Sequence, residues 1–494
     1  MKILVGRPTN NLSQTGAKRT LKYWRINHKS MDGMDFESIL NELKRNLKPY
    51  DDSEGSLTGI PETGLDENFL IEKLTGFARK ENVLWKEGKV SGAVYYGDEP
   101  LISFYDKLYH IVSQTNALHP DIWPSISKFE REIVSMSSSL MKGDDGTRGS
   151  VSSGGTESIL LAMKTYRDYF RKKKNITEPE IILPSSAHPA FLKACEYFSI
   201  KPVITGLDRD FRADIEKIKE NINNNTIGII GSAPNFPFGT FDPIPEIAEI
   251  SMDRGIGMHV DACLGGFIDP FVRDSGYKIV DFDFSVEGVT SISMDTHKYG
   301  YAPKGTSVIL YKNSEFFQHQ LYANATWQGG IYFSPTLLGS RAGYPIVAAW
   351  AAMLLMGYSG YKKAAKEILD AGDYIKKSVR RMNGLKIIGE PLWVIAITSG
   401  EIDPYLVWEA MGKNGWMLNG LSNPAGFHIA LTHRHTLSGI KESFVVDLTK
   451  AVESVRTGRV RTSSMAPIYG MASALPKESV DVFLKSIVEW LYSQ

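Results

Sequence analysis

Five short apolar runs separated by helix-like segments constrain the fold of this chain most strongly. They occupy residues 180–183, 227–230, 258–260, 289–294 and 306–311. Each run is bounded by Gly, Pro, Asp or Ser, as buried strands usually are. In a segment before the first run, Ile159, Met163, Tyr166 and Phe170 recur on one helical face. Strands that alternate with helices predict an α/β domain with a mainly parallel sheet flanked by helices.

The pattern changes on both sides of this region. Beyond residue 357 come helix-like stretches and three apolar runs, 385–388, 393–397 and 427–431, which predict a smaller C-terminal α+β domain. Residues 50–64 are acidic and rich in Gly, Ser and Pro, as linkers often are. We therefore divide the chain into an N-terminal arm and linker, an N-terminal segment, a large domain and a small domain, at residues 1–64, 65–98, 99–356 and 357–494.

Composition excludes several classes of protein. The 56 basic residues balance 56 acidic ones, which argues against a nucleic-acid-binding protein. The two cysteines, Cys195 and Cys263, cannot form a disulfide framework, so we expect a reducing, cytoplasmic location. No apolar stretch is long enough to predict a membrane span.

The first 30 residues contain seven basic residues and no acidic one. We interpret this segment as a mobile basic arm, or as an arm that packs on a partner subunit. A transit peptide and a peripheral contact with an anionic membrane remain open alternatives.

A Ser- and Gly-rich helix start is the first candidate ligand site. The sequence SSGGTE at residues 152–157 opens a predicted helix, and its free N–H groups with the Thr156 hydroxyl could cradle a phosphate. Two glycines, one of them Gly155, would let the backbone approach a ligand closely. Alone, such a sequence is more often only a helix cap.

Three further polar residues follow predicted strands, where ligands of parallel α/β sheets bind. Asp261 could pair with a protonated pyridine nitrogen or cap the next helix. Lys298, if partly desolvated, would have a lowered pKa and could form a Schiff base, although a lone lysine is usually a surface residue. His188 could stack on an aromatic ring or simply be solvated. Together with the phosphate cradle, these groups are what pyridoxal 5′-phosphate requires.

Eight segments of the chain carry a specific resemblance. The longest includes DTHKYGYAPKG at residues 295–305, and the others include GAVYYGDE from Gly92 and SGGTESILLA from Ser153. The chain resembles the sphingosine-1-phosphate lyases, within the wider group of pyridoxal-phosphate decarboxylase-like enzymes of fold type I. The segments run from 92 to 472: 92–99, 116–126, 153–162, 186–191, 259–267, 288–311, 327–343 and 468–472.

The resemblance implies a role for each matching residue. Lys298 would bind pyridoxal 5′-phosphate covalently, Asp261 would pair with its ring nitrogen, and His188 would stack on its ring. Gly155, Thr156 and His297 would hold its phosphate, which Ser340 would complete from the other subunit of a homodimer. Lys304 would bind the substrate phosphate, and Tyr469 would line the substrate site. Tyr95, Asn116 and His119 would reach the active site across the dimer interface. No metal site is predicted.

Several of these residues have plainer interpretations. Tyr95 could be a packing residue, Asn116 a turn former and His119 a loop residue without a ligand. Lys304 could be a solvated charge, and we interpret Cys263 as a small packing residue near the cofactor. The chain departs from the eukaryotic lyases in lacking their N-terminal membrane span. Its segment 463–467, SSMAP, also lacks an expected glycine.

The resemblance implies cleavage of the C2–C3 bond of a phosphorylated sphingoid base to a long-chain aldehyde and phosphoethanolamine. The general base stays open between the Lys298 amine, a tyrosine hydroxyl and a phosphate group. The nearest alternative is a pyridoxal-phosphate-dependent amino-acid decarboxylase, against which Lys304 weighs. A non-catalytic lipid-binding relative is a further alternative, but it would be expected to lose Lys298 or Asp261, and both are present.

Overall fold

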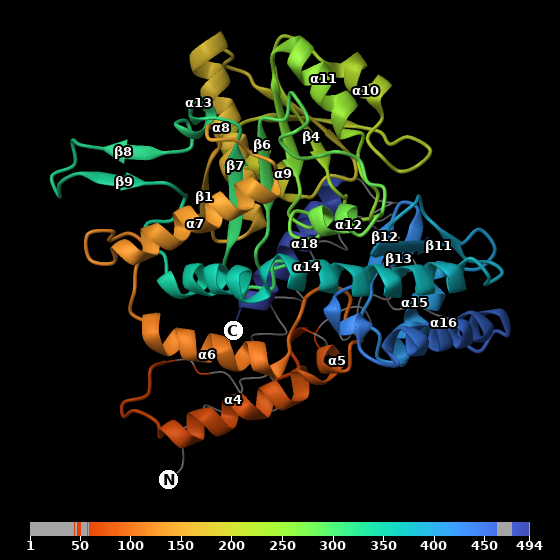
Figure 1. Cartoon of the computed structure of the whole chain (residues 1–494). Coiled ribbons are helices and arrows are strands. Elements are labelled where there is room, and N and C mark those ends of the chain that lie inside the picture. Colours follow the sequence, from red (N-terminus) through yellow and green to blue (C-terminus); the bar gives the residue numbers. More distant parts are fainter. Residues whose placement is uncertain (1–43, 45–46, 51–56, 58, 462–476, 494) are drawn as a thin grey trace.

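The fold is built on a seven-stranded sheet with the strand order β1-β7-β6-β5-β4-β2-β3. The computed structural model describes residues 44, 47–50, 57, 59–461 and 477–493 (Figure 1). All five predicted apolar runs contain strands of this one sheet. The strands are β1 (Arg148–Ser152), β2 (Glu180–Pro184), β3 (Lys201–Thr205), β4 (Thr226–Ser232), β5 (Gly257–Asp261), β6 (Ser291–Met294) and β7 (Ser307–Tyr311).

The antiparallel direction of β7 determines where the connection between β6 and β7 lies. Strands β2 to β6 pair in parallel, whereas β7 pairs antiparallel with both β6 and β1. The carboxyl ends of β1 and β2 to β6 therefore meet at one edge of the sheet. The connection 295–306 contains no crossover helix, so the chain can only turn back into an antiparallel strand. This connection stays at the carboxyl edge and carries Lys298 and Lys304.

Helices pack around the sheet, and further helices precede the large domain. The helices before and within the large domain are α4 (Glu67–Glu81), α5 (Val83–Lys86), α6 (Glu99–Val112), α7 (Pro124–Leu140), α8 (Gly155–Lys174), α9 (Ala190–Phe198), α10 (Ile215–Asn221), α11 (Ile244–Arg254), α12 (Asp269–Asp274) and α13 (Ser314–Phe317). The helical face predicted from residues 159 to 170 is confirmed, because all four of its apolar side chains are buried in α8.

Helices α8 and α11 cover opposite faces of the sheet. A Cβ atom at Gly228 of β4 would contact the Tyr166 ring of α8, at 3.3 Å. A Cβ atom at Gly231, three residues further, would lie 2.6 Å from Ile244 of α11. Residues an odd number apart point to opposite faces of a strand. The central strands are thus buried on both sides, which explains their continuous apolar runs.

The sequence did not predict β1 and β3, which are the two edge strands. β1 has the sequence RGSVS, with Val151 as its one large apolar residue, and β3 begins with Lys201 and Pro202. An edge strand pairs on one side only, so it needs fewer apolar residues and tolerates proline and lysine. The pattern that identified the central strands is therefore missing from both.

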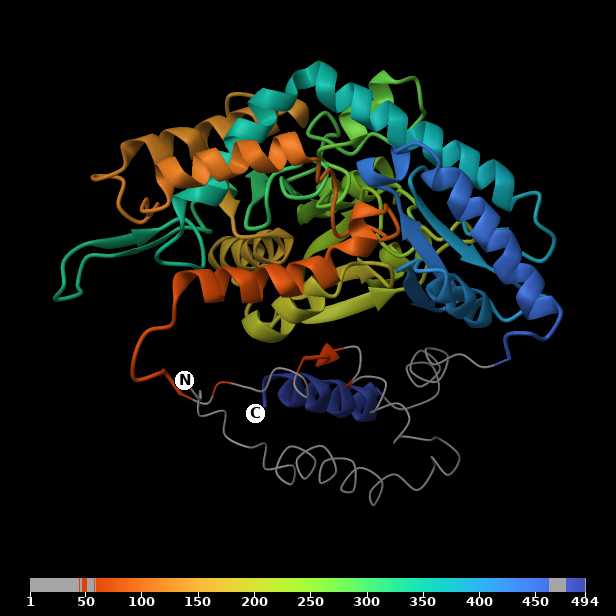
Figure 2. The same cartoon turned by 90° about the horizontal axis from the view of Figure 1, so that it is seen from below.

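The C-terminal part contains a separate antiparallel sheet with the order β10-β11-β13-β12. Helix α14 (Gly343–Val379) leads into it and bends at Gly357, where φ is 57° and ψ is 173° (Figure 2). The predicted start of the small domain falls on this bend, although the division into domains stays a prediction. The remaining elements here are β10 (Lys386–Ile387), β11 (Val394–Thr398), α15 (Pro404–Lys413), β12 (Asn419–Ser422), β13 (Ala425–Ala430), η2 (His433–Thr436), α16 (Ile440–Arg456) and α18 (Lys477–Tyr492).

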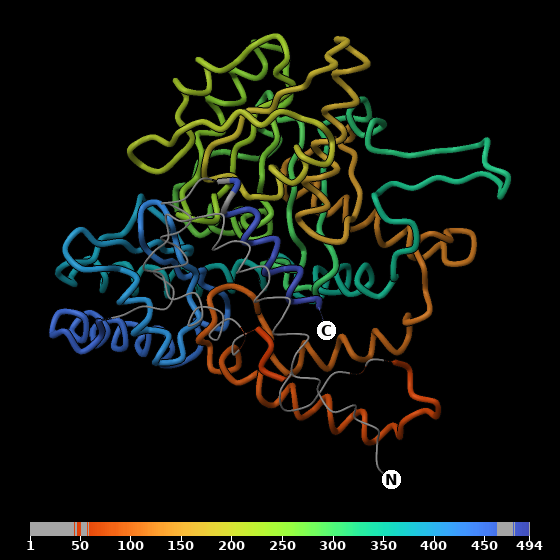
Figure 3. Tube along the Cα trace, turned by 180° about the vertical axis from the view of Figure 1, so that it is seen from behind, coloured from red at the N-terminus to blue at the C-terminus, as the bar shows by residue number. Residues whose placement is uncertain are grey.

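A two-stranded hairpin projects from the body of the molecule. It consists of β8 (Tyr322–Asn324) and β9 (Tyr332–Ser334) and is seen in outline in Figures 1 and 3. Its apolar side chains are exposed, among them Trp327, Ile331 and Phe333. An isolated two-stranded hairpin is marginally stable in water, so this one needs a further contact to be fixed.

Some predictions fall outside the described residues. They are the basic arm of the first 30 residues and Tyr469, and the linker at 50–64 is described only in part. Within the ranges that are described, no helix combines the length and the apolar character needed to cross a bilayer.

Candidate active site

Lys298 lies in a rigid turn directly after β6. Its Nζ atom is 2.9 Å from Oδ2 of Asp295, whose side chain is only 2% exposed. The backbone N–H of Asp295 donates to the Cys263 carbonyl, and the Thr296 hydroxyl is bound to Thr306 at the start of the next strand. Both ends of the turn are thus tied to the sheet, and the lysine amine is held at the carboxyl edge.

The ion pair corrects the lowered pKa expected of Lys298. Burial lowers the pKa of this amine, but the Asp295 carboxylate, with smaller contributions from Cys263 and Tyr95, raises it, and the net result lies above the ordinary lysine value. Burial likewise raises the pKa of Asp295, but Lys298 and His297 hold it below its usual range. The sequence could not show this, because the effect depends on a buried carboxylate placed within hydrogen-bonding distance.

Asp261 ends β5 and lies next to the turn. It is 8% exposed and stands in register with Ser293 of β6. Its Oδ1 atom accepts a hydrogen bond from the backbone N–H of Cys263, at 3.0 Å. A polar network lies beside it within the sheet. His259 Nδ1 is 2.8 Å from Ser291 Oγ, and His259 Nε2 is 3.2 Å from Ser293 Oγ. Burial lowers the pKa of His259 to about 4, so this imidazole is neutral at physiological pH.

The first turn of α8 lies against Asp295. A Cβ atom at Gly155 would be 2.7 Å from Asp295 Oδ2 and 2.8 Å from Oδ1, so only glycine fits here. Thr156 is exposed beside it. The His297 ring faces the same helix start: its Cε1 atom would lie 3.8 Å from a Cβ atom at Gly154. Backbone N–H groups, a hydroxyl and an imidazole thus converge on a site suited to an anion.

Glu157 fixes this helix start to a distant segment and was not predicted from the sequence. Its Oε2 atom accepts from the N–H of Ser153 at 2.6 Å, and its Oε1 atom accepts from the N–H of Leu337 at 3.0 Å. The side chain is buried. Glu157 therefore ties the predicted phosphate cradle to the segment after β9 that leads toward Ser340.

Lys304 and Tyr95 lie together in the same chain. The Lys304 ammonium is 4.9 Å from the centre of the Tyr95 ring, which packs edge-on against Tyr299. Burial raises the pKa of the Tyr95 hydroxyl, and the charges of Lys298 and Asp295 also act on it. Tyr95 therefore lies beside Lys304 within one chain, and its action across a dimer interface stays a prediction.

Asn116 and Ser340 form a second cluster. The Asn116 amide donates to Ser340 Oγ at 3.1 Å, and its Oδ1 atom accepts from the N–H of Arg341 at 3.1 Å. His119 is exposed and lies 4.0 Å from Asp121. Within the described part of one chain, none of these three side chains hydrogen-bonds to Lys298 or Asp261.

His188 makes no hydrogen bond to Lys298 within the part of the chain that the structure describes. It lies in the turn between β2 and α9, at the carboxyl edge of the sheet, and is exposed. Its Nδ1 atom accepts from the N–H of Ala190, at 3.1 Å, which fixes the ring at the start of α9.

The role of Asp295, like that of Glu157, was not predicted from the sequence. A signal was present, because this acid directly follows a predicted buried strand and precedes Lys298 by three positions. Acids at strand ends are common, however, and only the folded turn shows that this one faces the amine.

Comparison with known proteins agrees with this geometry. Residues 111–396 match the pyridoxal-dependent decarboxylase conserved domain. The chain is 43% identical to sphingosine-1-phosphate lyase of Drosophila melanogaster over 450 residues, covering 90% of this chain and 81% of that protein.

Solved structures agree as well. A sphingosine-1-phosphate lyase of Burkholderia pseudomallei superposes with a TM-score of 0.82 at 38% identity, covering 87% of this chain and all of that one. The glutamate decarboxylase of Lactobacillus brevis, at 18% identity, shares only the fold, with a TM-score of 0.69 and coverage of 83% and 98%. The predicted fold type I architecture is confirmed, and the chain belongs to the sphingosine-1-phosphate lyase family, whose members are pyridoxal-phosphate-dependent carbon–carbon lyases.

Proposed function

We propose that this chain cleaves the C2–C3 bond of sphingosine 1-phosphate or a related phosphorylated sphingoid base, releasing a long-chain aldehyde and phosphoethanolamine. The observation that carries this proposal is the position of Lys304 in the turn that holds Lys298. A second cation at the reactive lysine gives the substrate phosphate a partner. A decarboxylase substrate without a phosphate would not need it.

The residues present fit pyridoxal 5′-phosphate. Gly155, Thr156 and His297 converge at the start of α8, where a phosphate would be held, and any side chain at Gly155 would fill the cradle. Lys298 supplies the amine for the covalent bond. Asp261 supplies a buried carboxylate that would hold a proton on the ring nitrogen. When bound, this cofactor withdraws the electron pair of the broken carbon–carbon bond into its ring.

Side chains of the protein bind the substrate phosphate and stack on the cofactor ring, and a general base is needed for proton transfer. Lys304 binds and orients the substrate phosphate, and His188 supplies a flat ring for stacking at the carboxyl edge. The general base removes the proton of the C3 hydroxyl. Because burial raises the pKa of Tyr95, its hydroxyl stays protonated at neutral pH and is a poor base. Asp295 likewise keeps the Lys298 amine protonated, so a phosphate group is the favoured base for that step.

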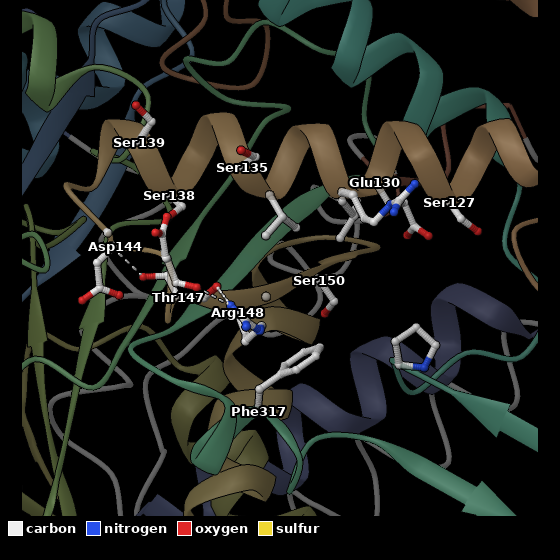
Figure 4. A pocket seen from close by; sticks show the side chains of 17 residues that line it. Ser127, Glu130, Ser135, Ser138, Ser139, Asp144, Thr147, Arg148, Ser150 and Phe317 are labelled. Carbon is white, nitrogen blue, oxygen red and sulfur yellow. Dashed lines mark hydrogen bonds between the residues drawn. The ribbon is translucent and has the colours of Figure 1, made fainter.

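The active form is proposed to be a homodimer with shared sites. Asn116 and Ser340 lie on one surface with the exposed β8–β9 hairpin. A cavity of about 110 Å³ between them is lined by Leu118, Phe333 and Gly339. A larger pocket of about 750 Å³ continues along α7 and the open edge of β1 (Figure 4). An apolar projection next to an open polar groove is what a second copy could cover.

We place the enzyme in the cytoplasm. Support comes from its two free cysteines, both buried, which need no oxidising compartment.

A product assay tests the function. The reconstituted enzyme is incubated with an equal mixture of sphingosine 1-phosphate and sphingosine, and mass spectrometry detects the products. We expect long-chain aldehyde and phosphoethanolamine from the phosphorylated base alone. Lys304→Met should lower kcat/KM for that substrate by about 10- to 100-fold, the effect of losing one desolvated charged contact. Lys363→Met, which removes an exposed lysine of α14, is the matched control. Release of CO₂ from glutamate, tyrosine or tryptophan instead would make the enzyme a decarboxylase.

A further inference from the structure

We propose that Asp295 is a positioning residue that keeps the Lys298 amine charged and pointed along one direction until it reacts. The proposal deepens the function above and rests on it for the role of Lys298. Its test, however, reads the chemistry of the lysine itself and needs no turnover.

Asp295 is enclosed on every side that the structure describes. Its side chain is 2% exposed, and its Oδ2 atom accepts from Lys298 Nζ at 2.9 Å. The Gly155 backbone at the start of α8 closes the cavity from one direction, and Cys263 Sγ lies against the same point. The carboxylate therefore has no room to rotate away from the amine.

One acid faces three basic groups here. Lys298 is in contact, His297 Nε2 is 3.7 Å away, and the Lys304 ammonium acts on the same turn. The positive end of the α8 dipole adds to them. Without the Asp295 charge, the Lys298 and Lys304 ammonium groups would repel each other inside a poorly hydrated site. The acid thus allows two lysines to be positioned six residues apart in one active site.

The second carboxylate oxygen strengthens this interpretation. Oδ1 of Asp295 is buried and makes no hydrogen bond of ordinary geometry among the described residues, although the nearby Ser307 hydroxyl helps to lower the pKa of this carboxyl. A purely structural acid in such a position would be expected to satisfy both oxygens. A carboxylate that leaves one oxygen unpaired beside a reactive amine instead resembles the arrangements found at functional sites.

The chemical consequence concerns the proton on Lys298. A protonated amine has no electron pair to donate, so Lys298 must lose its proton before its nitrogen can bond to a carbonyl carbon. Asp295 opposes that loss. It consequently sets the pH range in which the free amine forms, while its hydrogen bond holds the nitrogen beside the Gly155 end of α8.

Competitive acetylation measures this directly. The full chain, with its cofactor removed, is treated with a trace of acetic anhydride at about pH 9. Peptide mass spectrometry then gives the labelling of Lys298 relative to Lys363, whose side chain is 79% exposed. In Asp295→Asn we expect this ratio to rise between about tenfold and about a thousandfold, since an opposite charge at this distance shifts a pKa by one to three units.

Two variants separate this role from a general loss of stability. Asp283→Asn removes another carboxylate with a 2% exposed side chain, one that pairs with Arg273 at 3.0 Å, and should leave the Lys298 ratio unchanged. Asp295→Ala removes the carboxylate without adding volume at this enclosed position, and it should raise the Lys298 ratio as Asp295→Asn does.

An unchanged ratio in a folded Asp295→Asn variant would overturn the proposal. If that variant does not fold, the wild-type chain decides alone. Its Lys298 should be labelled with a midpoint above the ordinary lysine pKa of about 10.4. A midpoint at or below that value contradicts the proposal. Neither result depends on which substrate is cleaved, so failure here is distinct from failure of the lyase assignment.

Discussion

Lys298 and Lys304 lie in one turn but experience opposite surroundings. Asp295 raises the pKa of Lys298 against the effect of burial. Partial burial and the neighbouring Lys298 charge lower the pKa of Lys304 to about 8. The first amine is thus kept charged over a wide pH range, while the second changes its charge near physiological pH. The charged Lys298 amine is unreactive until it loses its proton. The Lys304 ammonium, when charged, can bind a phosphate.

The Lys304 pKa predicts a pH-dependent KM. This ammonium is charged below about pH 8 and neutral above it. We expect KM for sphingosine 1-phosphate to rise above about pH 8, approaching tenfold per pH unit at the alkaline end. Steady-state kinetics across this range measures the rise. Lys304→Arg should flatten it, because arginine stays charged. An equal rise in that variant would show that another group titrates.

The close contact at Gly155 predicts a stability cost. In Gly155→Ala the new methyl group would meet both Asp295 oxygens, and moving them would strain the ion pair with Lys298. We expect the free energy of unfolding to fall by about 1–3 kcal/mol, as for other overpacked sites. Chemical denaturation measures it. Gly154→Ala is the control, since its Cβ atom would meet nothing closer than 3.8 Å. Equal stability of both variants would contradict the tight packing.

At this scale the sequence could predict residue types but not their pairing. Lys298 and Asp261 follow buried strands, and the structure brings them to one edge of the sheet as expected. The pairing of Lys298 with Asp295 needed the turn geometry. The contact of Lys304 with Tyr95 was not predicted either, because the path of residues 65–98 leaves no periodic signal.

Among the elements, the start of α8 is connected by the Glu157 side chain to the segment that carries Ser340. Glu157 accepts backbone N–H groups from Ser153 and from Leu337, which are far apart in sequence. The helix that carries the phosphate cradle and the segment that carries Ser340 are therefore positioned together. A substitution that displaces the start of α8 should therefore also displace the segment that carries Ser340.

Hydrogen exchange tests this connection. In Glu157→Ala the Leu337 N–H loses its acceptor, so we expect its exchange to accelerate by at least about tenfold, the equivalent of one lost hydrogen bond. Glu180→Ala is a suitable control. It removes another buried glutamate, which lies on β2 and accepts hydrogen bonds from Lys201 and Asn223. This change should leave the exchange of the Leu337 N–H unaffected. Unchanged exchange at Leu337 in Glu157→Ala would contradict the coupling.

Elements were predicted where burial imposes a pattern. The central strands, buried on both faces, read as continuous apolar runs, and α8 shows a clear helical face. The edge strands β1 and β3 and the exposed hairpin lack this constraint. Their sequences are decided by pairing and by contacts that local periodicity does not record.

On the scale of the whole molecule, the β8–β9 hairpin exposes large apolar side chains to solvent. Ile331 is 79% exposed and Phe333 is 59% exposed, on a projection that contacts little of its own chain (Figure 1). Exposed apolar side chains on a marginal hairpin favour a contact with another molecule. The neighbouring Asn116 and Ser340 make a second copy the proposed partner.

Charging the hairpin should weaken the dimer. We expect Ile331→Asp combined with Phe333→Asp to shift the enzyme toward monomers in sedimentation velocity and to reduce activity, because Ser340 would no longer complete a neighbouring site. Ile204→Asp alters a 52% exposed residue on β3, at the opposite edge of the sheet, and should leave the mass unchanged. A dimer that survives the double change would place the interface elsewhere.

The most direct test of the whole account concerns the nitrogen of Lys298. The enzyme reconstituted with pyridoxal 5′-phosphate is reduced with borohydride, digested and analysed by peptide mass spectrometry, beside Lys298→Arg and Lys304→Met. We expect one reduced pyridoxyl phosphate group, attached at Lys298 in the wild type and in Lys304→Met, and absent from Lys298→Arg. Attachment at another lysine, or retention of the label in Lys298→Arg, would contradict this expectation.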